Sequence, residues 1–177
     1  MSDYIDYNDK NYLAGSKGFN DKPEREAIRK ISKTCSTFNP FLIEYLHLDL
    51  DNEHYYFVDD PLGIKNVDMG FIRERDEKII CILELGVFTK WKGNNFPYNT
   101  GLLNRVDRKT FRYTKYPYPY LSIDLNVEGT CGIMTTKETE LKYPLTEWPV
   151  YVKGVRKMQK GRRVLMKDTI KIGQWAA

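Results

Sequence analysis

Apolar residues recur along the chain with helical and strand periods, and these predict most of the secondary structure. Residues 1–20 have no apolar period, and we expect them to form a flexible acidic arm. An apolar stripe then predicts a helix over Pro23–Thr37, in which Pro23 suits the first turn because an N–H has no helical partner there. The segment Phe41–Leu50 fits a helix in its first half and a strand in its second, so the pattern leaves it open.

Alternating and continuous apolar runs predict the strands of a sheet. A turn at Asp59–Gly63 ends the first strand, and the third strand is a continuous apolar run, as expected of a central strand buried on both faces. The second and third strands are expected to pair as an antiparallel hairpin, and the last two to extend the sheet. The predicted strands are Tyr55–Val58, Val67–Arg73, Lys78–Phe88, Tyr120–Asn126 and Cys131–Thr135.

The order of these elements predicts one α/β (α+β) domain over residues 21–177, with a central mixed sheet of about five strands flanked by helices. A chain of 177 residues with 41% hydrophobic and 29% charged residues has the size and composition of one ordinary globular domain. The chain from Pro149 onward reads as strand with a turn at Gln159–Gly161, and we expect it to form a basic C-terminal extension.

Two segments gather basic residues in a way that is typical of phosphate binding. A helix is predicted over Gly101–Thr114, and its apolar residues and its cations would fall on adjoining stripes. The C-terminal extension has many cations and very few acids, although a solvated surface explains it about equally well. The candidate nucleic-acid-binding residues are Arg105, Arg108, Lys109 and Arg112 of the helix and Arg156, Lys157, Arg162 and Arg163 of the extension.

Charge and residue usage narrow the chemistry further. The formal charge is only +4, but acidic residues gather before Asp76 and basic ones after Lys90, and 13 tyrosines are interleaved with the cations. Two histidines exclude a three-histidine metal site, so carboxylates must hold any metal. Three widely spaced cysteines indicate reduced core residues rather than a zinc site or disulfides. We expect a cytoplasmic protein, because the sequence has neither a secretory signal nor an apolar run long enough to span a bilayer.

Two carboxylates of the predicted hairpin form the candidate metal site. Asp68 lies in its first strand and Glu84 ends the apolar run of its second, so the two can meet at one edge of the sheet. Mg²⁺ or Mn²⁺ is commonly held by one or two carboxylates together with water and substrate phosphate. The alternative is that Asp68 is a surface or turn residue and Glu84 a strand-end charge, and spacing alone leaves both open.

The same residues carry a resemblance to a known superfamily. The predicted order of elements resembles the core of the PD-(D/E)XK nucleases, which have a restriction-endonuclease-like fold. This order is a helix, a strand, a strand with Asp68, a strand with Glu84, and then a helix and a strand. This resemblance covers about 23–126. The chain is also similar to small phage and viral members, through Glu84-Leu85-Gly86, Lys90-Trp91-Lys92-Gly93, Phe96-Pro97-Tyr98 and Arg108-Lys109.

The resemblance implies a nuclease in which Asp68 and Glu84 bind the metal and a lysine two residues after Glu84 stabilises the attacking water. Here that position is Gly86. Lys90 would point to the same face of the strand as Glu84 but would lie roughly 20 Å from it along a straight strand. Lys109 is therefore the better candidate to replace the missing lysine. Without either lysine the chain would bind nucleic acid, DNA rather than RNA, without cutting it.

Three functions therefore stay open: a metal-dependent phosphodiesterase, a non-catalytic nucleic-acid-binding protein on the same fold, or a viral structural protein. A dimer is compatible with each. The loop aromatics Trp91 and Phe96 fit core packing better than base stacking, and the same holds for the tyrosines at 116, 118 and 120.

Overall fold

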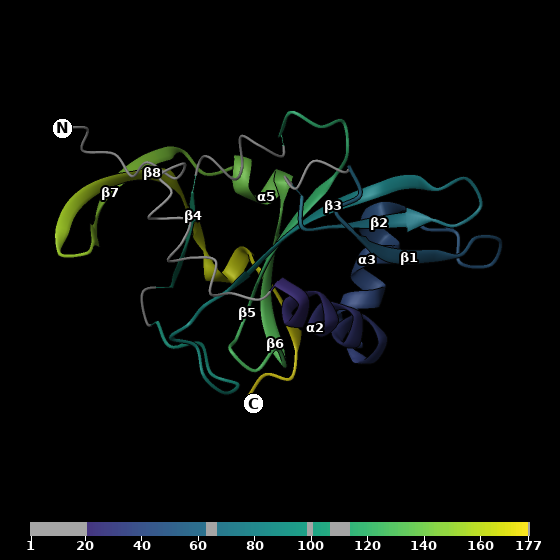
Figure 1. Ribbon diagram of the computed structural model, residues 1–177, viewed down its shortest axis with the longest axis horizontal. Helices are drawn as coiled ribbons and strands as arrows, with labels where there is room; N and C mark the ends of the chain where they lie inside the picture. Colours follow the sequence, from purple (N-terminus) through teal and green to yellow (C-terminus); the bar gives the residue numbers. More distant parts are fainter. Residues whose placement is uncertain (1–20, 63–66, 99–100, 107–113, 177) are drawn as a thin grey trace.

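The computed structural model describes residues 21–62, 67–98, 101–106 and 114–176 (Figure 1). The acidic arm expected over residues 1–20 lies outside them. In the described part, two sheets form the body of the protein and the helices are short and few.

Two consecutive helices precede the sheets. Helix α2 spans Asp21–Thr34, close to the prediction, and α3 spans Phe38–Leu46, so the segment that the pattern left open begins as a helix. His47 ends α3 in the left-handed conformation, with φ 53°. Sequence reasoning missed a third, short helix, α5 at Lys137–Leu141, whose first turn is capped by the Thr136 hydroxyl accepting the Thr139 N–H.

The larger sheet has six strands in the order β1-β2-β3-β5-β6-β9. Only β3 and β5 run parallel, and the other neighbours are antiparallel, so the sheet is mixed. The predicted mixed sheet flanked by helices is therefore confirmed, with six strands in place of about five. The strands are β1 (Tyr55–Asp59), β2 (Met69–Arg73), β3 (Lys78–Val87), β5 (Tyr120–Leu125), β6 (Cys131–Thr136) and β9 (Ile170–Gly173).

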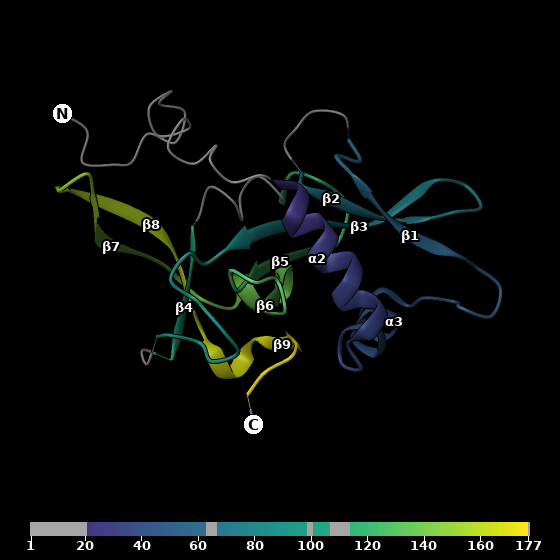
Figure 2. The ribbon, with the colours of Figure 1, turned by 60° about the horizontal axis from the view of Figure 1, so that its bottom comes forward.

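The core of the protein lies on both faces of this sheet. Helices α2 and α3 cover one face (Figure 2). Ile28 of α2, Phe38 of α3 and Leu83 and Leu85 of β3 belong to one buried apolar cluster there. The opposite face carries smaller apolar clusters, one of which joins β6 to the second sheet. The alternation along β3 therefore directs Leu83 and Leu85 to the helices and Glu84 to the opposite face.

The second sheet has three antiparallel strands in the order β4-β8-β7: β4 (Leu102–Val106), β8 (Val155–Leu165) and β7 (Leu145–Val152). β7 and β8 form a hairpin that extends away from the six-stranded sheet (Figure 1). Its turn is Lys153–Gly154, where both residues have positive φ, 50° and 78°.

The turn predicted at Gln159–Gly161 is wrong. Gly161 lies inside β8, and its lack of a side chain serves close packing rather than a turn. A Cβ at this position would overlap the carbonyl oxygen of Arg105 and would lie 2.8 Å from the Trp148 ring. The glycine therefore allows β4 and Trp148 to approach β8 closely.

The helix predicted over Gly101–Thr114 is also wrong for its first part, because Leu102–Val106 is strand β4. β4 pairs with β8, and Leu103 and Arg105 are buried while Asn104 is exposed, which is strand alternation. The prediction placed Arg105 on a phosphate-binding stripe, whereas Asp124 of β5 and Glu140 of α5 hold it inside the protein. Residues 107–113 lie outside the described part of the chain.

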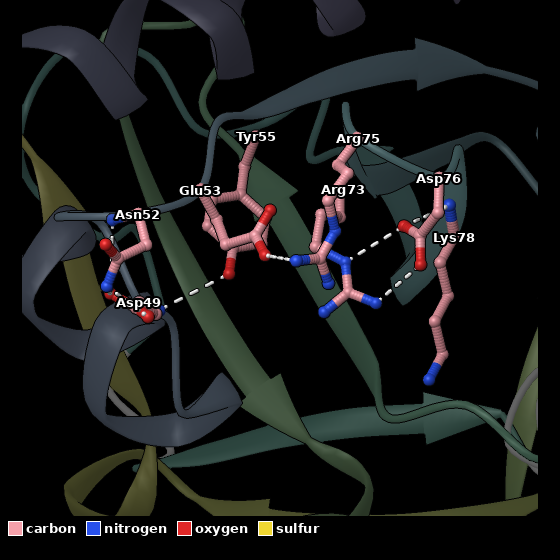
Figure 3. Close-up of polar contacts among 8 residues, drawn as sticks. All are labelled: Asp49, Asn52, Glu53, Tyr55, Arg73, Arg75, Asp76 and Lys78. Atoms are coloured by element: carbon pink, nitrogen blue, oxygen red, sulfur yellow. Dashed lines mark hydrogen bonds and ion pairs between the residues drawn. The ribbon is translucent and has the colours of Figure 1, made fainter.

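Polar contacts stabilise the end of the β1-β2-β3 meander (Figure 3). Arg73 donates two hydrogen bonds to the Asp76 carboxylate, at 2.9 and 2.6 Å, across the β2–β3 turn. The Arg73 hydrogen bond lowers the pKa of Asp76 to about 2. Arg75 pairs with the buried Glu53 at 2.6 Å, which ties the same turn to the chain before β1.

The three cysteines are free thiols, as predicted. Cys81 and Cys131 are fully buried, and burial raises the pKa of both thiols, to about 11 for Cys131. The Cys35 sulfur accepts the Gly173 N–H at 3.2 Å, which joins the residue that follows α2 to the end of β9.

Candidate metal and nucleic-acid site

Asp68 and Glu84 come from neighbouring chain segments. Asp68 directly precedes β2 rather than lying within it, and the antiparallel register pairs Met69 with Leu83. One step further along this register, Asp68 stands opposite Glu84. The Asp68 carboxylate accepts the Leu85 N–H at 2.7 Å, so it lies against β3 at the residue after Glu84.

The backbone of Asp68 is also held in place. Its carbonyl oxygen accepts the Arg25 guanidinium of α2 at 3.2 Å and the Asp60 N–H at 3.3 Å. Arg25 in turn lies 3.5 Å from the Asp59 carboxylate at the end of β1. Contacts from a helix and a strand end therefore fix the residue that stands opposite Glu84 in the register.

Glu84 lies on a polar strip of the otherwise apolar sheet face. Its side chain is 7% exposed, and the parallel register places it beside Ser122 of β5. Two residues further along, Gly86 pairs with Asp124. Because residues two apart on a strand share a face, Glu84, Ser122, Gly86 and Asp124 all lie on this strip.

Asp124 occupies the space above Gly86. A Cβ built on Gly86 would lie 2.5 Å from Oδ1 of Asp124, so any larger residue there must displace the carboxylate. The position where the superfamily resemblance expects a lysine is thus filled by an anion from the next strand.

A buried arginine neutralises that anion. Arg105 reaches from β4 across to the six-stranded sheet and forms an ion pair with Asp124. Its Nε lies 3.3 Å from the Glu140 carboxylate of α5 and donates to the Thr135 hydroxyl at 3.1 Å, and its Nη2 donates to the Ser122 carbonyl at 3.2 Å. Arg105 therefore joins β4, β5, β6 and α5, and its predicted place on a solvent-facing phosphate stripe is wrong.

Glu140 completes the buried network. It is 2% exposed and accepts hydrogen bonds from the Tyr120 hydroxyl at 3.0 Å and the Thr135 hydroxyl at 2.7 Å. Sequence reasoning missed Arg105 as the partner of Asp124, and it missed Glu140 altogether. A capping threonine before an acidic turn, Thr136 ahead of Glu138 and Glu140, was the available signal for α5.

The remaining candidate lysines and arginines fall in three places. Lys90 is exposed in the turn that follows β3, three residues beyond the end of the strand that carries Glu84. Arg108, Lys109 and Arg112 lie outside the described residues.

The four candidates of the C-terminal extension are all on β8 but do not share a face. The register directs Arg156 and Arg162 to one face of the hairpin and Lys157 and Arg163 to the other. Arg163 lies over the Trp148 ring, with its guanidinium carbon 5.2 Å from the ring centroid.

The loop aromatics pack in the core, as expected. Trp91 is fully buried, and its ring centroid lies 5.1 Å from those of both Phe96 and Trp175. Tyr120 is also fully buried, and Tyr116 and Tyr118 pack beside it and Ile82.

Comparison of the chain with protein-family models, with curated proteins and with solved structures gave no match. No helix in the described ranges has the length and apolar character needed to cross a membrane.

The contact between Asp124 and Gly86 can be tested by its effect on stability. We expect Gly86→Ala to lower the free energy of unfolding by about 1–3 kcal/mol, because the added methyl forces the Asp124 carboxylate away from its place beside Arg105. Urea unfolding followed by circular dichroism measures the change. In an Asp124→Ala background the same substitution should cost little, and an equal loss in both backgrounds would contradict the overlap.

Proposed function

We propose that this protein is a metal-dependent nucleic-acid phosphodiesterase, with DNA as its substrate, in which Asp68 and Glu84 hold Mg²⁺ or Mn²⁺. The observation that supports the proposal most is the hydrogen bond from Leu85 N–H to the Asp68 carboxylate, which sets Asp68 against β3 at Glu84. The register places Glu84 opposite Asp68, and Glu84 is 7% exposed on the face of the sheet away from α2 and α3.

The donor set suits a hard divalent cation. Two carboxylates leave the remaining positions to water and substrate phosphate, which is the usual arrangement for Mg²⁺. Asp68 and Glu84 would contribute two such ligands; among the described residues, no group of three or more His, Cys, Asp or Glu side chains is spaced to hold a metal. When bound, the cation would supply Lewis-acid stabilisation of charge on a phosphoryl oxygen.

The residues of the site would divide the remaining work. Asp68 and Glu84 would hold the cation, and the Leu85 N–H would orient the Asp68 carboxylate. Asp124 and Arg105 would keep the adjoining strip ordered, because their ion pair ties β4 to β5 beside Glu84. Basic residues of β8 would bind phosphates of the substrate.

A second function, nucleic-acid binding without cleavage, is favoured by one observation. The Asp124 carboxylate occupies the space above Gly86, so that position offers no cation to a phosphoryl group that gathers negative charge. Losing one such electrostatic partner commonly costs a hundredfold or more in rate. An active enzyme therefore needs a cation from elsewhere in the chain, and Lys109 remains the candidate from the sequence.

A cleavage assay separates the two functions. We expect the wild-type chain to cut labelled DNA in Mg²⁺ or Mn²⁺ and to leave it intact in EDTA, because the acids supply no Lewis acid by themselves. Single- and double-stranded DNA and RNA are compared on denaturing gels, beside a binding measurement in EDTA. Tight binding without cleavage in either metal would rule out the enzyme and leave the binding protein.

A further inference from the structure

Among the described residues, the β7–β8 hairpin is a two-stranded ribbon over most of its length. β7 and β8 stay paired from Leu145 with Arg162 to Val152 with Val155, and the described part of β4 pairs with β8 from Gly161 onward. The ribbon, defined as Glu147–Val152 with Val155–Lys160, is two strands wide in this part of the structure and about 20 Å long. Both ribbon views show it extending away from the six-stranded sheet (Figures 1 and 2).

The hairpin accounts for the basic charge of the whole chain. Leu145–Leu165 contains six basic residues and one acidic residue, a formal charge of +5, whereas the complete chain has +4. The other residues together are therefore slightly acidic. A net charge concentrated on one projecting element favours an anionic partner at that element.

The cations lie on both faces of the hairpin. Arg156 and Lys160 point to one face of the ribbon and Lys157 to the other, and Arg163 shares the face of Lys157 at the base of the hairpin, where β4 pairs with β8. Near the tip, Tyr151 is 73% exposed on the face of Arg156 and Val155 is 56% exposed on the face of Lys157, so each charged face also carries apolar surface.

We propose that the β7–β8 hairpin binds duplex DNA by entering the major groove, with each face directed toward one of the two phosphate backbones. The major groove of B-DNA is about 12 Å wide and admits a two-stranded ribbon. A flat anionic surface would require cations on one face only. The deep and narrow major groove of duplex RNA does not admit such an element, which selects DNA.

This inference deepens the proposed function by naming double-stranded DNA as its substrate, and it concerns binding rather than cleavage. The experiment is therefore run in EDTA, where metal-dependent cleavage cannot occur. Fluorescence anisotropy of a labelled short DNA duplex measures affinity over a series of salt concentrations. Single-stranded DNA and duplex RNA of the same sequence are measured beside it.

Two double variants test the two faces separately: Arg156→Gln/Lys160→Gln and Lys157→Gln/Arg163→Gln. We expect each to weaken duplex binding by about tenfold or more and to lower the log–log salt slope by about two, since each phosphate contact contributes about 0.9. Lys30→Gln/Lys33→Gln is the matched control, because it removes two exposed cations from α2 and should change neither quantity. Circular dichroism checks that every variant is folded.

The outcomes distinguish this inference from the proposed function. Weaker binding by both face variants, with a preference for duplex DNA, supports groove entry even if wild type cuts nothing. Loss of affinity in one face variant only, or equal binding of single-stranded DNA or duplex RNA, would overturn it. Face variants that bind duplex DNA with the same affinity as the control variant would also overturn it, even if the wild type cleaves DNA.

Discussion

Replacing Asp68 by Asn, or Glu84 by Gln, is expected to reduce metal-dependent cleavage by on the order of a thousandfold, while affinity for uncut DNA in EDTA changes little. The cation supplies several kcal/mol of stabilisation to charge at phosphorus, and about 1.4 kcal/mol corresponds to tenfold in rate. The isosteric amides suit this test because Asn can still accept the Leu85 N–H and Gln fits the buried position of Glu84. Single-turnover cleavage with each metal measures the effect.

Asp51→Asn and Glu44→Gln are the controls, since they remove the same charges from exposed positions away from β3. Cleavage by Glu84→Gln at the wild-type rate would show that the assigned site is wrong. In the same assay we expect Lys109→Ala to lower the rate more than Lys90→Ala, because Lys90 lies in the exposed turn after β3.

Replacing Arg105 by Met is expected to lower the free energy of unfolding by about 3–5 kcal/mol. Arg105 is 7% exposed and pairs with Asp124 and Glu140, so its removal leaves buried carboxylates without this cation. Breaking a buried ion pair by removing one partner costs that amount because the remaining charge stays desolvated. Urea unfolding at neutral pH measures the loss.

Arg156→Met is the matched control, since the same substitution at an exposed position of β8 should change stability by no more than about 0.5 kcal/mol. The double variant Arg105→Met/Asp124→Asn should lose less than the two single losses added together, because the two residues share one interaction. A variant at Arg105 with wild-type stability but a reduced salt slope of DNA binding would instead support its assignment to a phosphate-binding stripe.

The buried ion pair also explains why the candidate site was only partly predictable. Asp68 and Glu84 could be identified because strand parity and a short hairpin connection determine which residues lie opposite each other. Asp124 belongs to a strand that runs parallel to β3 after a long connection, and Arg105 to a strand of the other sheet. No local pattern specifies such pairings, because they depend on contacts between residues far apart in the chain.

The segment at β4 illustrates the same limit for secondary structure. Leu102 to Val106 fits a helix with a cationic stripe and a strand with buried alternate residues. Pairing with β8 and the acids around Arg105 decide for the strand. The prediction of a turn at Gly161 was wrong for a related reason. A glycine is equally compatible with a turn and with a strand that another segment approaches closely, and here the approaching residue, Arg105, is distant in sequence.

The sequence by itself determined the mixed sheet with its flanking helix α2, the β2–β3 hairpin, the buried character of β3 and the core packing of Trp91. These follow from periodicity and from local pairing, which nearby residues control. Only the tertiary structure decided the second sheet, the network of Arg105, Asp124 and Glu140, and the division of the β8 cations between two faces. Each of these depends on which distant segments pair and in what register. A buried charge such as that of Arg105 is tolerated only when oppositely charged side chains from those segments lie beside it.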